Sequence, residues 1–158
     1  MQDWRYILSY TKAIYHIIFR TKFGAPTICE ENEKQLYNYI WGIIKELKCD
    51  LYQINGMPDH LHLLVDLHPM ISIGEFVQKI KISSHNWIDQ NKTLFPDFYA
   101  WSIGYCALTY SELEKEKIKN YIKKQKEHHK SQNFMDETKF LLTSAGIEIN
   151  EKYFERDI

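Results

Sequence analysis

The 158-residue sequence lacks the features that mark disulfide-rich, membrane-spanning or secreted proteins. Its three cysteines, Cys29, Cys49 and Cys106, are far apart and form no CxxC pair, so three reduced thiols are expected. No stretch approaches the ~20 consecutive apolar residues that a membrane-spanning helix needs. The N-terminal residues have neither the basic head nor the long apolar run of a signal peptide. We therefore expect a cytoplasmic protein that does not contact a membrane.

The sequence also has no excess of charge of one sign, because its net charge is only -1. With 44% apolar and 26% charged residues, and no repeat, low-complexity tract or linker, it predicts a single globular domain over residues 1–158. The charge is unevenly distributed, with seven lysines and two glutamates between Lys115 and Lys130. Such a segment is compatible with binding to phosphates, and equally with a solvated helix face.

The order of secondary-structure signals predicts an α+β fold. An apolar run at 13–21 suggests a buried strand, and helical spacing follows at 31–47. Two strands are expected between 50 and 67, around turns at Asn55-Gly56 and Pro58-Asp59, the second beginning at His60. A helix starting near Ser72, a strand at 98–110, a charged helix from Ser111 to about His129 and a short helix at 136–146 complete the chain.

This β-α-β-β-α-β order is that of the ferredoxin-like or RRM-like sandwich. Such a fold has an antiparallel sheet with both core helices on one face, and we expect the other face to be open. The charged helix, which bears Tyr121, and the short final helix are additions to this core.

Two histidines interrupt an apolar strand in the segment MPDHLHLLVDL, residues 57–67. Because alternate residues of a strand share a face, His60 and His62 lie on one side, while Leu61 and its apolar alternates face the helices. Imidazoles at the resulting spacing of ~7 Å can converge on one metal ion. Two independent polar residues on a solvated sheet face are the alternative.

The charged helix offers a possible second half of such a site. Tyr121 and Gln125 are four residues apart and share a helix face, and this helix is weakly amphipathic, so it should dock lightly. The Gln125 amide oxygen could complete a two-histidine, one-glutamine metal site. A tyrosine hydroxyl with a pKa of ~10 becomes a plausible nucleophile when a metal polarises a scissile phosphate. Packing of Tyr121 against Ile118 is the alternative.

These motifs resemble a known family across nearly the whole chain. GMPDHLHLLVDL carries a His-hydrophobic-His (HUH) motif, and YHIIFRTK, WSIGYCALTYS and KNYIKKQKEHH resemble the first strand, fourth strand and tyrosine helix of one HUH family. That family is the single-tyrosine transposases of the IS-two-hundred/IS-six-hundred-and-five type, which include the REP-associated tyrosine transposases.

The resemblance implies that Tyr121 cleaves single-stranded DNA, forming a 5′-phosphotyrosine link and releasing a 3′-hydroxyl. His60, His62 and Gln125 would hold Mg²⁺ or Mn²⁺. Family members are dimers that recognise DNA hairpins, and they often place the tyrosine helix of one subunit at the HUH site of the other. The residues that we expect on the DNA surface are Lys117, Lys124, His129, Arg20 and Lys22. A solvated position at the helix end is the alternative, and favoured, interpretation of His129.

Two other functions remain open at this stage. A domesticated or RRM-like protein would bind nucleic acid without cutting it, but such binding needs exposed aromatic residues where this chain has His60 and His62. A metal hydrolase that activates water would not need Tyr121, and would usually need a carboxylate base close to the metal. Asp66 shares the face of the histidines but lies ~13 Å from His62 along the strand, too far to act directly.

Overall fold

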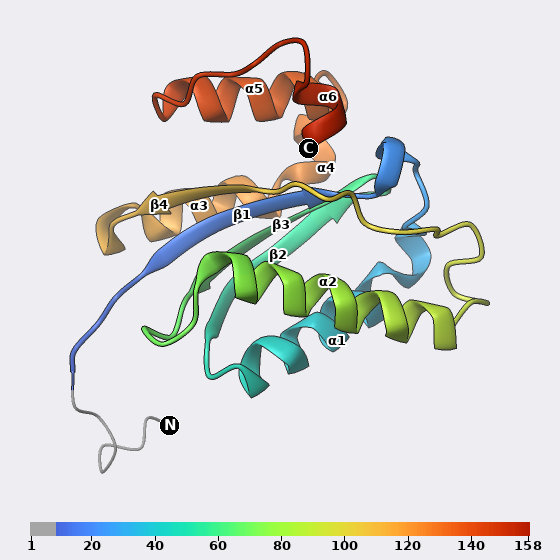
Figure 1. Ribbon diagram of the computed structural model, residues 1–158, viewed down its shortest axis with the longest axis horizontal. Coiled ribbons are helices and arrows are strands. Elements are labelled where there is room, and N and C mark those ends of the chain that lie inside the picture. Colours follow the sequence, from blue (N-terminus) through green and yellow to red (C-terminus); the bar gives the residue numbers. More distant parts are fainter. Residues whose placement is uncertain (1–8) are drawn as a thin grey trace.

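The sheet of this protein has four antiparallel strands in the order β2-β3-β1-β4. A computed structural model describes residues 9–158 (Figure 1). The strands are β1 (Ile14–Arg20), β2 (Asp50–Met57), β3 (His60–Asp66) and β4 (Cys106–Tyr110). Helix α1 (Glu33–Glu46) connects β1 to β2, and α2 (Ile73–Gln90) connects β3 to β4. The predicted β-α-β-β-α-β order is therefore confirmed.

Helices α1 and α2 cover one face of the sheet (Figure 1). The alternation predicted for β3 is correct, because Leu61, Leu63 and Val65 are completely buried in the core on this face. The neighbouring strand β1 contributes Ile17 and Phe19 to the same core. At roughly 1.5–3 kcal/mol for each large apolar side chain buried, this layer supplies most of the drive for folding.

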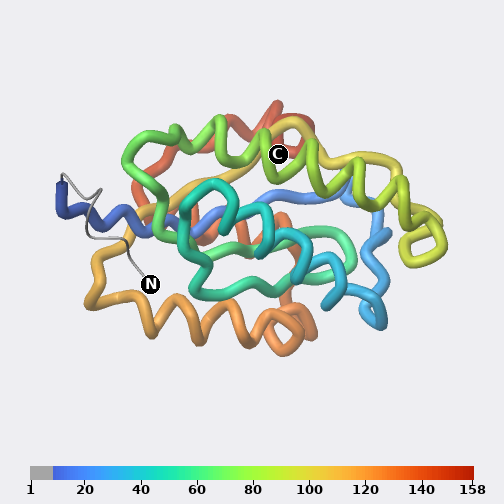
Figure 2. The backbone as a smooth tube through the Cα atoms, turned by 90° about the horizontal axis from the view of Figure 1, so that it is seen from below, coloured from blue at the N-terminus to red at the C-terminus, as the bar shows by residue number. Residues whose placement is uncertain are grey.

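The C-terminal elements cover the opposite face of the sheet, which the sequence predicted to be open. Helix α3 (Lys115–Lys123) lies against β2 and β3, and α5 (Phe134–Ser144) packs over β1 and β4 (Figures 1 and 2). Short helices α4 (Gln125–His128) and α6 (Phe154–Asp157) complete this layer, which starts with a 3₁₀ turn, η4, at Glu112–Glu114. A second core joins Ile18 of β1 to Phe134 and Leu142 of α5. Because the apolar side chains of α5 are buried against this face of the sheet, the prediction that the face is open is wrong.

The turn between β2 and β3 is shorter than the sequence suggested. Asn55 and Gly56 belong to β2, where they pair with His62 and Leu61, so only Pro58 and Asp59 form the turn. Gly56 is required by a close approach, because a Cβ there would lie 2.2 Å from the backbone oxygen of His60. Asn55-Gly56 is therefore not a turn, and the glycine is present because there is no room for a side chain at this position of the strand.

The strand predicted at 98–110 is also shorter, since only its last five residues form β4. The Lys81 ammonium group of α2 donates hydrogen bonds of 2.8 Å to the backbone oxygens of Ser102 and Gly104. These bonds hold the segment before β4 against α2. A single bridge from Trp101 to Thr21 is all that extends the pairing toward β1.

The helix boundaries differ from the predictions at two places. The charged helix breaks at Lys124, which separates Tyr121 on α3 from Gln125 on α4. Helix α5 begins at Phe134 and not at residue 136, because the Asn133 side chain caps its first turn by accepting a hydrogen bond from the Asp136 amide.

The helix starts predicted near Ser72 and at Ser111 agree with the structure. Ser72 caps α2 by accepting a hydrogen bond from the Glu75 amide, and Ser111 and Glu114 form a capping box. All three cysteines are free. Among the helices of residues 9–158, none is long and apolar enough to cross a membrane.

Candidate metal centre and nucleophile

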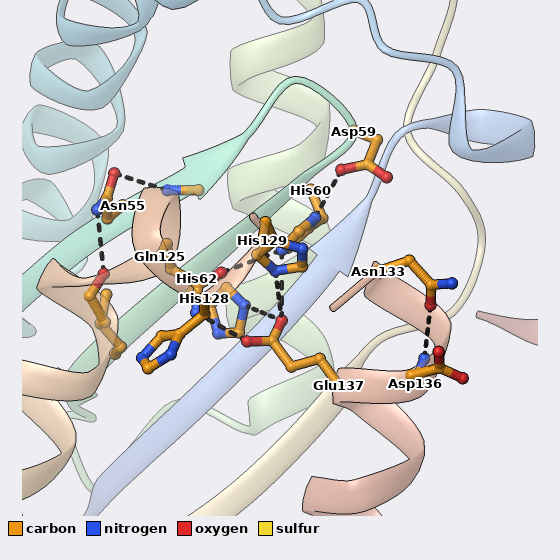
Figure 3. A network of polar contacts seen from close by, with 12 residues as sticks. Asn55, Asp59, His60, His62, Gln125, His128, His129, Asn133, Asp136 and Glu137 are labelled. Carbon is orange, nitrogen blue, oxygen red and sulfur yellow. Dashed lines mark hydrogen bonds and ion pairs between the residues drawn. The ribbon is translucent and has the colours of Figure 1, made fainter. Parts of the chain in front are cut away.

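His60 and His62 project from β3 toward the C-terminal layer, and both side chains are completely buried (Figure 3). His60 Nδ1 lies 2.7 Å from Oδ1 of Asp59, in the preceding turn. A carboxylate only accepts hydrogen bonds, so the Nδ1–H group donates, and in the neutral ring the lone pair of Nε2 points into the site. This carboxylate–histidine arrangement is the usual way in which proteins orient a metal-binding imidazole.

Gln125 presents its amide oxygen to the same point. Its Oε1 lies 3.2 Å from His60 Nε2, and its Nε2 donates a hydrogen bond of 2.9 Å to Oε2 of Glu137. That second bond fixes the orientation of the amide, so that its oxygen faces the histidines (Figure 3). The sequence predicted these three side chains as one group, and the fold brings them together.

The centre of the site is occupied by the carboxylate of Glu137, which the sequence analysis did not identify. This residue of α5 is 1% exposed, and its Oε1 lies 3.1 Å from His62 Nε2 and 2.9 Å from His129 Nε2 (Figure 3). His60 Nε2 is 3.5 Å from the same oxygen. Burial alone would raise the pKa of Glu137, but the three surrounding imidazoles, His129, His60 and His62, lower it far below its usual range.

These residues have the chemistry of a divalent metal site. Ligand atoms of His60, His62, His129 and Glu137 all lie within 4.8 Å of one another. Imidazole nitrogen with carboxylate and amide oxygen is a donor set that suits Mn²⁺, and Mg²⁺ can use its oxygen members. Burial acts to lower the pKa of His60, yet Asp59 and Glu137 raise it overall, so its surroundings favour a positive charge at this ring.

Tyr121 lies at the edge of this cluster. Its hydroxyl donates a hydrogen bond to Glu137 Oε2, and its ring packs edge-on to His62 with centroids 6.2 Å apart and stacks on His128 at 4.6 Å. Burial and the bond to Glu137 both raise the pKa of the Tyr121 phenol. The hydroxyl is therefore protonated in this arrangement, and a carboxylate is in place to accept its proton.

A third histidine, His16 of β1, supports His62 from behind. His16 Nε2 lies 2.7 Å from His62 Nδ1, and both side chains are completely buried. Burial holds the pKa of His16 well below its usual range and lowers that of His62 to about 4. With both rings neutral near pH 7, one ring nitrogen donates to the other along this bond, and the tautomer in which His62 Nδ1 donates is the one that leaves its Nε2 free as a metal ligand.

The residues expected on a DNA surface have different environments. Lys117 and Lys124 are exposed, and Lys22 is partly buried beside the rings of Phe23 and Tyr99. Arg20 is 7% exposed, because its guanidinium donates to backbone oxygens near the C-terminus, those of Glu155 and Ile158. In this conformation Arg20 holds the C-terminal segment and is not presented at the surface.

His129 is not solvated, contrary to the favoured interpretation of the sequence. Its side chain is 6% exposed, and its ring lies 4.6 Å from that of His60. After the helix break at Lys124, α4 packs against β2, and the end of the basic segment lies in the interior.

A four-stranded sheet of this order, with a His-Leu-His strand facing a tyrosine and a glutamine, defines the single-tyrosine HUH class of nucleases. Residues 9–125 match the model of the family described as "Transposase IS200 like", which is most of the chain, and the protein belongs to that family.

Individual relatives agree with this assignment. The chain is 29% identical to the ISDra2 transposase TnpA of Deinococcus radiodurans over 115 residues, which cover 70% of this chain and 82% of that protein. A crystal structure of a transposase from Deinococcus radiodurans has a TM-score of 0.59 and 28% identity, covering 79% of this chain and 98% of the other. A REP-associated tyrosine transposase bound to a REP hairpin has a TM-score of 0.58, covering 82% and 74%; at 12% identity it shares the fold.

Proposed function

We propose that this transposase cleaves and rejoins single-stranded DNA by transesterification, with Tyr121 as the nucleophile. The observation that carries the proposal is the hydrogen bond from the Tyr121 hydroxyl to Glu137, a carboxylate that also contacts the imidazoles of His60 and His62. A nucleophile and a proton acceptor within hydrogen-bond reach, next to a set of metal-binding groups, are the parts that phosphoryl transfer to a phenol requires.

The reaction exchanges one phosphodiester for another. The Tyr121 oxygen attacks the scissile phosphorus, a P–O bond to tyrosine forms, and the bond to the 3′ oxygen breaks. The phenol proton passes to Glu137 Oε2, and the 3′ oxygen takes up one proton from water as it leaves as a hydroxyl. A 5′-phosphotyrosine remains, and attack by a 3′-hydroxyl reverses the reaction without an added energy source, because the number of phosphoester bonds does not change.

A divalent ion, Mg²⁺ or Mn²⁺, held by His60, His62 and Gln125 would stabilise the charge that develops on the phosphoryl oxygens. The residues themselves provide orientation. Asp59 fixes the ring of His60, and Glu137 fixes both the Gln125 amide and the Tyr121 hydroxyl.

The substrate that we propose is single-stranded DNA with hairpins at the ends of a mobile element. The exposed Lys117 on the tyrosine helix and Lys124 at its end suit contact with phosphates, and Lys22 lies near two exposed aromatic rings, those of Phe23 and Tyr99. A structural neighbour at 12% identity is described as bound to a REP hairpin, which supports the hairpin as ligand. We also expect a homodimer, from the resemblance to the family.

The test is incubation with single-stranded DNA from the flanks of the gene, in the presence of Mg²⁺, followed by denaturing electrophoresis. We expect a covalent protein–DNA band with the wild type and none with Tyr121→Phe, while both proteins bind the hairpin equally. Tyr110→Phe is a matched control, since that phenol packs near Tyr121 but makes no contact with Glu137. Cleavage that survives in Tyr121→Phe would contradict the assignment. Hairpin binding without any cleavage by the wild type would favour the alternative, a non-cleaving DNA-binding protein.

A further inference from the structure

Glu137 lies beyond the part of the chain that defines the family, because the family match ends at Gln125. It is nevertheless the residue on which the candidate site converges. Its side chain is 1% exposed, and its two oxygens contact the side chains of His60, His62, His129, Gln125 and Tyr121. A buried carboxylate with that many polar partners needs a specific explanation.

The contacts place several hydrogen-bond acceptors against one another. Since His60 Nδ1 donates to Asp59, the neutral His60 ring presents a lone pair to Gln125 Oε1 at 3.2 Å and to Glu137 Oε1 at 3.5 Å. Three acceptor atoms at this separation are stable only when a proton or another cation lies among them. A divalent ion is the cation that this donor set suits.

The separations also suit ligands of a single ion. Atoms that bind one ion at 2.0–2.2 Å in octahedral directions lie about 3 Å from their neighbours. Glu137 Oε1 is 3.1 Å from His62 Nε2 and 3.5 Å from His60 Nε2. The carboxylate oxygen therefore lies where a neighbouring ligand would lie, and its position requires no movement of α5.

We propose that Glu137 is itself a ligand of the divalent ion, in addition to His60, His62 and Gln125. This inference rests on the proposed function, since it concerns the same site. One carboxylate would then bind the ion through Oε1 while Oε2 holds the Tyr121 hydroxyl. With an anionic ligand contributed by α5, the protein binds the ion in the absence of DNA.

The competing explanation is that the carboxylate takes the place of the DNA phosphate and leaves when DNA binds. The two explanations make opposite predictions for Glu137→Gln, which keeps the size of the side chain and removes its charge. If Glu137 is a ligand, Glu137→Gln weakens binding of the divalent ion. If Glu137 only takes the place of the DNA phosphate, the substitution leaves binding of the ion unchanged or makes it tighter.

The experiment measures Mn²⁺ binding to the full-length protein without DNA, by the loss of the electron paramagnetic resonance signal of free Mn²⁺. We expect the Kd of Glu137→Gln to rise at least about tenfold, because replacement of groups that only support metal ligands already costs 10–100-fold. The control is Asp136→Asn, which makes the same charge change at the exposed neighbouring residue of α5 and should leave the Kd unchanged.

A Kd for Glu137→Gln within twofold of the wild type would overturn the proposal, as would a wild type that shows no saturable Mn²⁺ binding. If circular dichroism shows that Glu137→Gln is unfolded, Glu137→Asp decides the question. Its carboxylate is one methylene short of the site, so we expect a Kd raised severalfold, and an unchanged Kd refutes the proposal. Failure of the proposed function is distinguishable, because it would appear as Mn²⁺ binding of the expected pattern without a covalent DNA band.

Discussion

Asp59 is predicted to control metal binding without being a ligand. Its Oδ1 accepts a hydrogen bond of 2.7 Å from His60 Nδ1, and that bond sets both the orientation and the protonated nitrogen of a completely buried ring. In Asp59→Ala the ring of His60 loses the acceptor for its Nδ1–H group. The tautomer with the proton on Nε2 then becomes about as stable as the one with the proton on Nδ1. A protonated Nε2 cannot bind a metal ion.

The size of the effect follows from the environment of this bond. Hydrogen bonds to charged groups contribute about 1.5–3 kcal/mol, and the Asp59 side chain is 31% exposed, which favours the lower part of that range. Loss of groups that orient metal ligands usually weakens metal affinity about 10–100-fold. Since a factor of ten corresponds to about 1.4 kcal/mol, the two estimates agree. We expect the Kd for Mn²⁺ to rise about tenfold or somewhat more.

Isothermal titration of the DNA-free protein with Mn²⁺ measures this change. Asp59→Asn is the informative companion, because its amide oxygen can still accept from Nδ1 and should therefore retain most of the affinity. Asp66→Ala is the matched control, since it removes an acid at the other end of β3 that bonds to the Ala13 amide. An Asp59→Ala protein that binds Mn²⁺ as the wild type does would refute the orienting role. A similar loss in Asp66→Ala would attribute the effect to general destabilisation.

Three further predictions concern the neighbouring elements. Gly56→Ala should lower the free energy of unfolding by about 3 kcal/mol in denaturant titrations, because its Cβ would overlap the backbone of His60; an unchanged midpoint would contradict the close approach. A mixture of Tyr121→Phe and His60→Ala proteins should form no covalent DNA adduct, because one chain supplies both groups of a site; restored activity would show that sites form between subunits. Replacing Lys117 and Lys124 by Gln should reduce the slope of log K against log salt by up to about 1.4 for a single strand, and an identical slope would exclude them from the DNA surface.

The part of the site on β3 could be predicted because a strand has a strict period of two. The alternation alone assigned His60 and His62 to one face and Leu61, Leu63, Val65 and Leu67 to the other, and the structure places them so. The period of two could not predict that the histidine face is covered. The C-terminal helices fold back over this face, and nothing in the sequence of β3 indicates that they do.

Glu137 was missed for a different reason. In the sequence it belongs to an acidic first turn, which a helix dipole explains without burial. The available signal was its position three residues after Phe134 and five before Leu142, on the same stripe that packs against the sheet. A carboxylate on an apolar stripe requires a partner in the interior, and here the partners are the histidines of β3 and His129, which follows α4.

The pairing of Tyr121 with Gln125 was predicted from helical spacing, but the sheet is what holds the two residues in place. The helix breaks between them, and the amide group of Asn55 donates to the backbone oxygens of Ile122 and Lys123, at 3.0 and 3.1 Å. These carbonyl groups lie at the C-terminal end of α3, where no N–H group of the helix is available to them, and Asn55 supplies the missing donors. Because Asn55 belongs to β2 and pairs with His62 of β3, a single strand pair fixes the tyrosine, the glutamine and the histidines. The relative positions of nucleophile and metal-binding groups therefore depend on sheet register, which explains how a site can be assembled from two short helices.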